Sequence, residues 1–185
     1  MRRLINLAAG AMLALGALSP VLADDTMIED FAVHPETRWR FFSDTVMGGV
    51  SSGQVSFEQE AGQAHARMTG RVSTANNGGF IQIRLDLVGP PPEGTVGVRL
   101  IARGNDQRYF VHLRTSGTLL PWQYYQAGFD VTRDWAEIRL PFDAFAASGA
   151  LLRTTPRAQS LTAIGIVAYG RDHDAAIDVR EVGFY

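Results

Sequence analysis

The chain has 185 residues, contains neither cysteine nor lysine, and carries a formal net charge of −2. This length is enough to bury a core of its own, and the acidic balance argues against a nucleic-acid binder, which needs basic side chains to neutralise phosphates. The absence of cysteine excludes disulfides, thiolate catalysis and cysteine metal sites, and it fits a bacterial chain better than a small eukaryotic secreted domain.

The first residues resemble a secretory signal peptide. Arg2 and Arg3 precede an apolar run over residues 4–18, and small residues lead up to Ala23. The run is about 15 residues long, whereas a membrane-spanning helix needs roughly 20, so an uncleaved anchor is the weaker alternative. We predict a signal over residues 1–23, a single mature domain over residues 24–185 and a periplasmic location. Without Arg2 and Arg3 the formal charge changes from −2 to −4.

Short segments with period-two alternation follow one another along the rest of the chain. The clearest are residues 79–87, where Ile81, Ile83 and Leu85 alternate with polar side chains, and residues 109–114. The remaining predicted strands cover residues 38–43, 53–59, 63–72, 95–103, 123–129, 136–140, 161–169 and 175–185. Short helical turns are predicted around residues 26–31, 142–147 and 155–159. A change of phase in the last strand indicates a β-bulge near Arg180 and Glu181.

About ten strands, each with one apolar face, have to bury those faces against a second sheet. The pattern therefore predicts an all-β fold, a jelly-roll β-sandwich with short peripheral helical turns, because this architecture closes off most exposed strand edges. No repeat or long linker divides residues 24–185.

Two glycine-centred segments stand out. Asp44 leads into Met47-Gly48-Gly49-Val50-Ser51, and Asn76-Asn77-Gly78-Gly79-Phe80 precedes the clearest strand. One interpretation is structural, with the short polar side chains of Asp44, Asn76 and Asn77 capping turns around the paired glycines. The other is functional, with both segments meeting at one end of the sandwich to hold a ligand or a partner loop.

Together with these two segments, further motifs carry a family resemblance. They are Trp39, Arg103-Gly104-Asn105, Trp135 and Ile138-Arg139-Leu140-Pro141-Phe142. From about residue 39 to residue 185 the chain resembles the complex I intermediate-associated protein 30 family, whose domain is a galactose-binding-like jelly roll. The resemblance implies a non-catalytic protein that engages a protein partner, as relatives do in assembling respiratory complex I. Those relatives act on the matrix side of the mitochondrial membrane, whereas the predicted signal directs this chain to the periplasm.

Chemistry-bearing motifs are few. Gly49-Val50-Ser51-Ser52-Gly53 has the G-x-S-x-G pattern of a hydrolase nucleophile elbow, but that elbow requires a strand before it and a helix after it, and a strand is predicted to follow. The densest group of metal-ligand types is Asp172-His173-Asp174, which a solvated turn explains better. A structural calcium ion stays open as an alternative, although no motif places one. We predict no catalytic residue, cofactor or metal ligand.

A binding surface is the remaining expectation. One interpretation places four outward arginines and three aromatic residues on one face: Arg84, Arg99, Arg103, Arg114, Trp122, Tyr124 and Tyr125. Such a face suits sugars and extended peptides, since aromatic rings cover apolar patches and guanidinium groups bind polar groups. Trp39 and Trp135 are predicted to be core residues. A solvated sheet surface is the alternative. The candidate residues for binding a ligand or partner are Asp44, Met47, Asn76, Asn77, Arg84, Arg99, Arg103, Trp122 and Tyr125. A protein partner is the first expectation and a periplasmic carbohydrate ligand is the alternative.

Overall fold

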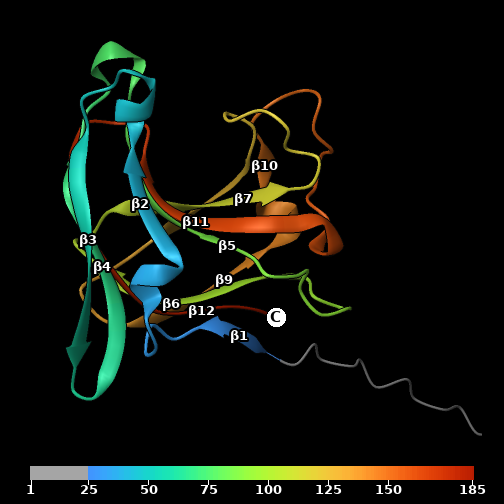
Figure 1. Cartoon of the computed structure of the whole chain (residues 1–185), viewed down its shortest axis with the longest axis horizontal. Helices are drawn as coiled ribbons and strands as arrows, with labels where there is room; N and C mark the ends of the chain where they lie inside the picture. The colour runs from blue at the N-terminus through green and yellow to red at the C-terminus, as the bar shows by residue number, and fades with distance from the viewer. Residues whose placement is uncertain (1–24) are drawn as a thin grey trace, which may run out of the picture.

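A computed structural model describes residues 25–185, which form two antiparallel sheets packed face to face (Figure 1). One sheet has the order β3-β4-β12-β6-β9 with β1 added beside β12, and the other has the order β10-β8-β7-β11-β5-β2. The strands are β1 (Thr26–Glu29), β2 (Trp39–Ser43), β3 (Ser52–Glu60), β4 (Gln63–Val72), β5 (Phe80–Asp86), β6 (Gly97–Gly104), β7 (Arg108–Thr115), β8 (Tyr125–Asp130), β9 (Ala136–Pro141), β10 (Ala146–Ala147), β11 (Leu161–Tyr169) and β12 (His173–Phe184).

This arrangement confirms the predicted all-β jelly-roll sandwich, and each of the ten predicted strands is present. Five single turns of 3-10 helix connect strands in the described residues: η1 (Pro35–Thr37), η2 (Asp44–Met47), η3 (Ala75–Asn77), η4 (Phe142–Ala144) and η5 (Ala158–Ser160). The predicted signal peptide and its boundary fall outside the described residues. Within residues 25–185, no helix has the length and apolar character required to cross a membrane.

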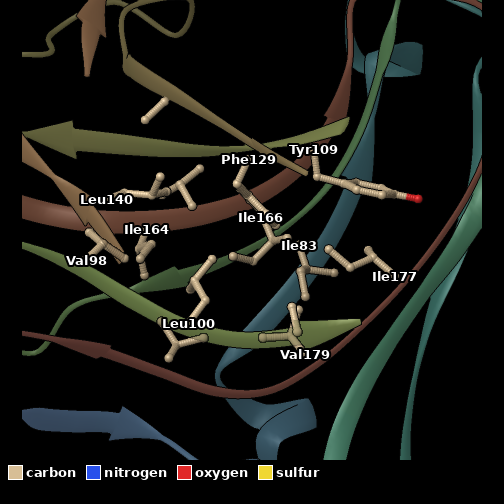
Figure 2. Close-up of a cluster of buried hydrophobic side chains, with 14 of the residues drawn as sticks. Ile83, Val98, Leu100, Tyr109, Phe129, Leu140, Ile164, Ile166, Ile177 and Val179 are labelled. Carbon is tan, nitrogen blue, oxygen red and sulfur yellow. The ribbon is translucent and has the colours of Figure 1, made fainter. Parts of the chain in front are cut away.

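The core lies between the two sheets and follows from the alternation in the sequence (Figure 2). Ile83 on β5 and Ile164 and Ile166 on β11 point from one sheet toward Leu100 on β6 and Val179 on β12 of the other. Each of these five side chains is fully buried, and burial of such a side chain contributes roughly 1.5–3 kcal/mol. Apolar burial from both sheets therefore holds the sandwich together.

Three local expectations were wrong. The predicted helical turn at residues 26–31 is strand β1, which pairs with the end of β12 through Thr26↔Phe184. The strand predicted over residues 95–103 begins only at Gly97, and Val96 before it is exposed. Trp135 is half-buried outside the core, whereas Trp39 is buried as predicted.

The predicted bulge is confirmed. The register of β12 against β6 shifts between Val179 and Glu181, so Ile177 and Val179 before the shift and Val182 and Phe184 after it all face the core. The apolar alternation of the sequence changes phase at this point, and the extra residue of the bulge keeps the apolar side chains on the inner face.

Candidate binding site

The two glycine segments meet around the side chain of Asp44. Asp44 begins η2 and is fully buried. Its Oδ1 atom accepts a hydrogen bond from the Ser51 backbone N–H at 2.9 Å, and its Oδ2 atom accepts one from the Ser51 hydroxyl at 2.5 Å. Oδ2 also accepts from the backbone N–H groups of Gly79 at 2.5 Å and Phe80 at 3.2 Å. One carboxylate therefore joins residues 44–51 to residues 78–80.

Two of the glycines lie so close to this carboxylate that their positions have no room for a side chain. A Cβ atom built on Gly49 or on Gly78 would overlap Asp44. Burial by itself raises the pKa of Asp44, but the hydrogen bonds from the Ser51 hydroxyl and from the backbone of Gly79, Ser51 and Phe80 outweigh it and leave the pKa below its usual value. The paired glycines thus allow the chain to wrap closely around a buried, ionised aspartate.

Ser51 belongs to the same cluster. Its hydroxyl donates to Asp44 and accepts from the Ser73 backbone N–H at 2.9 Å, and the residue is buried. Strand β3 follows it at once, without the helix that a nucleophile elbow requires. The G-x-S-x-G pattern is therefore explained by the packing of the glycine segments.

The Asp44 cluster lies at one end of the outer face of the β10-β8-β7-β11-β5-β2 sheet. In Figure 1 this face looks upward from β5, β7 and β11, with the turn at η2 on one side and the loops before β8 and after β10 on the other. Strand pairing places its side chains in rows. One row contains Phe42, Gln82, Val167 and Phe110, and the next contains Arg84, Gly165, His112 and Gln126.

Six ring-bearing residues run across these rows: Phe42, Phe80, Phe110, His112, Tyr124 and Tyr169. We call the part of the outer face that they cover, together with the polar residues between them, the aromatic face. Phe42 meets Phe80 edge-on with ring centroids 6.5 Å apart, and Tyr169 meets Phe110 edge-on at 5.9 Å. His112 stacks on Tyr124 at 4.0 Å with the rings 8° from parallel. Val167 lies under this layer and is fully buried although it points outward.

Polar groups are fixed between the rings. His112 Nε2 is hydrogen-bonded to Gln126 Oε1 at 2.8 Å, and the Arg84 guanidinium lies over the Phe42 ring at 5.0 Å. Burial lowers the pKa of His112 to about 4, although the bond to Gln126 acts in the opposite direction, so the imidazole is neutral near pH 7. Burial raises the pKa of Tyr124, whose hydroxyl lies 3.4 Å from that of Tyr169. The imidazole on this face is therefore neutral, and the charges beside the rings belong to the ion pairs Arg84–Asp86 and Arg108–Asp130.

The structure brings together part of the predicted site. Arg84 lies on the aromatic face, and Asp44, Met47, Asn76 and Asn77 lie in the two glycine segments at its end. Met47 is exposed, and both asparagines adopt left-handed backbone conformations, which this residue type tolerates. Their contact with a ligand stays a prediction. Sequence reasoning did not single out Phe42, Phe80, Phe110, His112 or Tyr169, although Phe110 and His112 share the outward phase of Arg114.

The prediction that four arginines share one face with Trp122 and Tyr125 was wrong. Arg84 and Arg114 belong to the sheet that carries the aromatic face, but Arg99 and Arg103 lie on β6 in the opposite sheet. Tyr125 is 2% exposed and packs in the core, because it is adjacent to Tyr124 on the chain and adjacent residues of a strand point to opposite faces. Trp122 lies in the loop before β8 and is exposed.

Arg103 has a structural partner instead. Its Nε donates to Asp178 Oδ2 at 2.9 Å, and Arg67 holds the same buried carboxylate from the other side, with Nε 2.8 Å from Oδ1. The Arg103 guanidinium also lies over the Trp135 ring at 4.6 Å. Arg99 pairs with Glu181 and Glu137, both at 2.8 Å. These arginines are engaged in cross-strand ion pairs on the second sheet.

Metal-ligand geometry is absent from the described residues, where no group of three or more histidine, aspartate or glutamate side chains could hold an ion. Asp172 instead accepts from the backbone N–H and the hydroxyl of Thr74, at 2.7 and 2.8 Å. A pocket of about 560 Å³ is lined among others by Ile28, Arg38, Leu87 and Pro91. It contains none of the six ring-bearing residues.

The amino-acid sequence matches a family model over most of its length. The model of the Complex I intermediate-associated protein 30 (CIA30) family matches residues 30–178, which include both glycine segments and nearly the whole sandwich. The chain belongs to the CIA30 family. A search of curated proteins finds no match.

Solved structures confirm the fold of this CIA30 member. The family 11 carbohydrate-binding module of the cellulosomal cellulase Lic26A-Cel5E of Clostridium thermocellum superposes with a TM-score of 0.71, at 11% identity, over 88% of this chain and 95% of that module. The same Clostridium thermocellum module in complex with a β-1,3-1,4-mixed-linked tetrasaccharide gives 0.69, at 11% identity, over 86% and 94%. The family 30 module of the cellulase Cel9D-Cel44B from that organism gives 0.53, at 10% identity, over 74% and 90%.

Proposed function

We propose that this CIA30 member is a non-catalytic binding protein that engages a protein partner during the assembly of an envelope or respiratory complex. The observation that carries the proposal is the aromatic face. Tyrosine, phenylalanine and arginine are enriched in protein interfaces, and charged pairs are depleted from interface centres. On the aromatic face, His112 is neutral and the rings of Phe110 and Tyr169 are only half-buried. The family is itself named for association with complex I intermediates.

Site-specific photocrosslinking in the cells that produce the protein tests this proposal. A photoreactive residue replaces Gln126 on the aromatic face, and the control replaces Arg71, which is exposed on β4 of the other sheet. We expect a discrete crosslinked species from position 126 that is absent from position 71, and that disappears when Phe110→Ser is added. Equal crosslinking from both positions, or none from position 126, would contradict the proposal.

Carbohydrate binding is the second candidate function, because His112 stacks on Tyr124 and is hydrogen-bonded to the amide of Gln126. Flat rings cover the apolar face of a sugar, and amides bind its hydroxyl groups. A structural neighbour of 11% identity holds a mixed-linked tetrasaccharide. Calorimetry with mixed-linked β-glucan oligosaccharides and with peptidoglycan fragments tests this candidate.

Saturable binding that weakens about tenfold for Tyr124→Ala, but not for Trp135→Ala on the other sheet, would support carbohydrate binding. Tyr125→Ala is unsuitable as a test because Tyr125 is a core residue. Absence of a heat signal with both sugar classes would remove this candidate and leave the protein-partner proposal standing.

A periplasmic location is also proposed, on the charged and apolar residues at the N-terminus. Mass spectrometry of the chain recovered from fractionated cells tests it. The expected result is a mature N-terminus at Asp24 in the periplasmic fraction. Recovery of an intact Met1 in the membrane fraction would instead support an uncleaved anchor.

A further inference from the structure

Two loops flank one end of the aromatic face and are bound to each other. The loop between β7 and β8 covers residues 116–124, and the loop after β10 covers residues 148–157. The Ser148 backbone N–H donates to the Tyr124 carbonyl at 2.9 Å, and the Ser148 hydroxyl donates to the Trp122 carbonyl at 3.1 Å. The two loops lie together at the upper right of Figure 1. They therefore form one surface.

This surface carries large apolar side chains that point into solvent. Leu119 is 83% exposed, Trp122 is 65% exposed and Leu151 is 90% exposed. Leu120 follows Leu119 in the chain and is also exposed. We call these four residues the apolar tip. Exposed apolar residues scattered singly need no explanation, but a group of them at one end of a domain marks an interaction surface.

The loop that carries three of the four residues is held rigidly. The Arg114 guanidinium donates to three carbonyl oxygens of this loop, those of Thr118 at 2.9 Å, Leu120 at 3.1 Å and Pro121 at 2.9 Å. Gln123 exchanges hydrogen bonds with the backbone of Leu120. Because these contacts fix the loop before any binding event, little conformational entropy is lost when the tip meets its partner.

The charges around the apolar tip are positive. Arg153 and Arg157 are exposed, and neither forms an ion pair within residues 25–185. Nine other arginines do, whereas Arg114, Arg171 and Arg180 are held by hydrogen bonds to uncharged groups instead. No aspartate or glutamate occurs in residues 107–129 or 144–171. Both arginines thus lie on the loop that carries Leu151, and neither loop of the tip contains a carboxylate.

We propose that the apolar tip docks on an anionic lipid surface, with Leu119, Trp122 and Leu151 entering the interfacial region and the guanidinium groups of Arg153 and Arg157 meeting lipid phosphates. Tryptophan favours the boundary between headgroups and acyl chains, and apolar insertion adds to electrostatic attraction in interfacial binding. Each arginine near an anionic bilayer adds to the attraction. The two unpaired arginines favour an anionic lipid surface as the partner, because an interface formed by apolar contacts alone does not require unpaired cations. The apolar tip adjoins the aromatic face but shares no residue with it, and its role does not depend on the proposed partner.

Sedimentation with vesicles tests the proposal. The chain from Asp24 onward is used, because the two sheets and their core are complete within residues 25–185 and the apolar run at residues 4–18 would itself bind lipid. Vesicles of phosphatidylcholine mixed with phosphatidylglycerol are compared with vesicles of phosphatidylcholine alone. We expect sedimentation with the mixed vesicles. Tryptophan fluorescence should be quenched when the lipids carry brominated acyl chains, and Trp122→Phe should lose this quenching although Trp39 and Trp135 remain.

Matched variants identify the surface. Leu119→Ser and Leu151→Ser should each weaken partitioning about tenfold, and Arg153→Gln and Arg157→Gln about fivefold each. Val88→Ser removes an equally exposed apolar side chain elsewhere, and Arg133→Gln removes an exposed arginine paired with Asp106, so both should leave partitioning unchanged. Failure to sediment with mixed vesicles would overturn the proposal, as would equal sedimentation of the tip variants and the wild type.

Discussion

The carboxylate of Asp44 accepts a hydrogen bond from the backbone N–H of Gly79 at 2.5 Å, although 35 positions separate the two residues in the chain. This bond joins the turn after β2 to the turn before β5, the two adjacent strands at one edge of their sheet. The glycine segments that identify the family therefore form one structural unit. This unit fixes the start of the strand that carries Phe80, Gln82 and Arg84 onto the aromatic face.

Replacing Asp44 should strongly destabilise the domain. In Asp44→Ala the N–H groups of Ser51, Gly79 and Phe80 lose their acceptor, and we expect a loss of about 3 kcal/mol or more in the free energy of unfolding. Urea unfolding followed by circular dichroism measures it. The control is Asp134→Ala, which removes an exposed carboxylate and should change the stability by less than about 0.5 kcal/mol. A small effect at Asp44 would mean that water replaces the carboxylate.

Adding a methyl group beside the carboxylate should have a similar effect. Gly49→Ala and Gly78→Ala each place a Cβ where Asp44 lies, so we expect a loss of roughly 2–3 kcal/mol from overpacking. Gly89→Ala serves as the control, since no atom lies within 4 Å of its added Cβ. Thermal unfolding of the three variants compares them directly. Equal midpoints for all three would show that the turns can open around Asp44 at little cost.

Removal of the Arg103 guanidinium should affect stability and leave binding intact. Arg103→Gln breaks one of the two arginine contacts to the buried Asp178, and we expect a loss of about 1–2 kcal/mol because Arg67 still holds the carboxylate. Crosslinking from position 126 should persist at the wild-type level. A stable variant that loses the crosslink would instead assign Arg103 to the binding surface, as the sequence alone had indicated.

The sequence predicted the strands well because alternation is a local property. Ile81, Ile83 and Leu85 alternate with outward polar residues, and the structure buries all three. The bulge in β12 was visible for the same reason, as a change of phase between Val179 and Val182. Strand β1 was missed because its four residues are too few to show a period and pair only with the end of β12.

The candidate site was harder to predict because alternation shows which side chains point inward and which point outward, but it does not show to which sheet a strand belongs. Arg84 and Arg103 both point outward, yet they lie on opposite sheets, and that difference depends on pairings between distant segments. Tyr125 could have been placed correctly, since it shares its phase with the apolar residues Ala127 and Phe129, and all three are buried. The stack of His112 on Tyr124 joins strand β7 to the residue just before β8, and neither segment alone carries a signal for it.

His112 should make stability depend on pH. Its pKa in the folded chain is about 4, below the ordinary value of 6.5, so the unfolded chain takes up a proton at a higher pH than the folded chain does. The stability associated with the neutral imidazole is therefore complete above about pH 6.5 and is lost progressively as the pH falls to about 4. At 1.36 kcal/mol for each pH unit, the loss amounts to about 3 kcal/mol.

Urea unfolding between pH 7 and pH 4 should show a shallower pH dependence for His112→Phe than for the wild type. Parallel curves for His112→Phe and the wild type would show that the imidazole is protonated as easily in the folded chain as in the unfolded one.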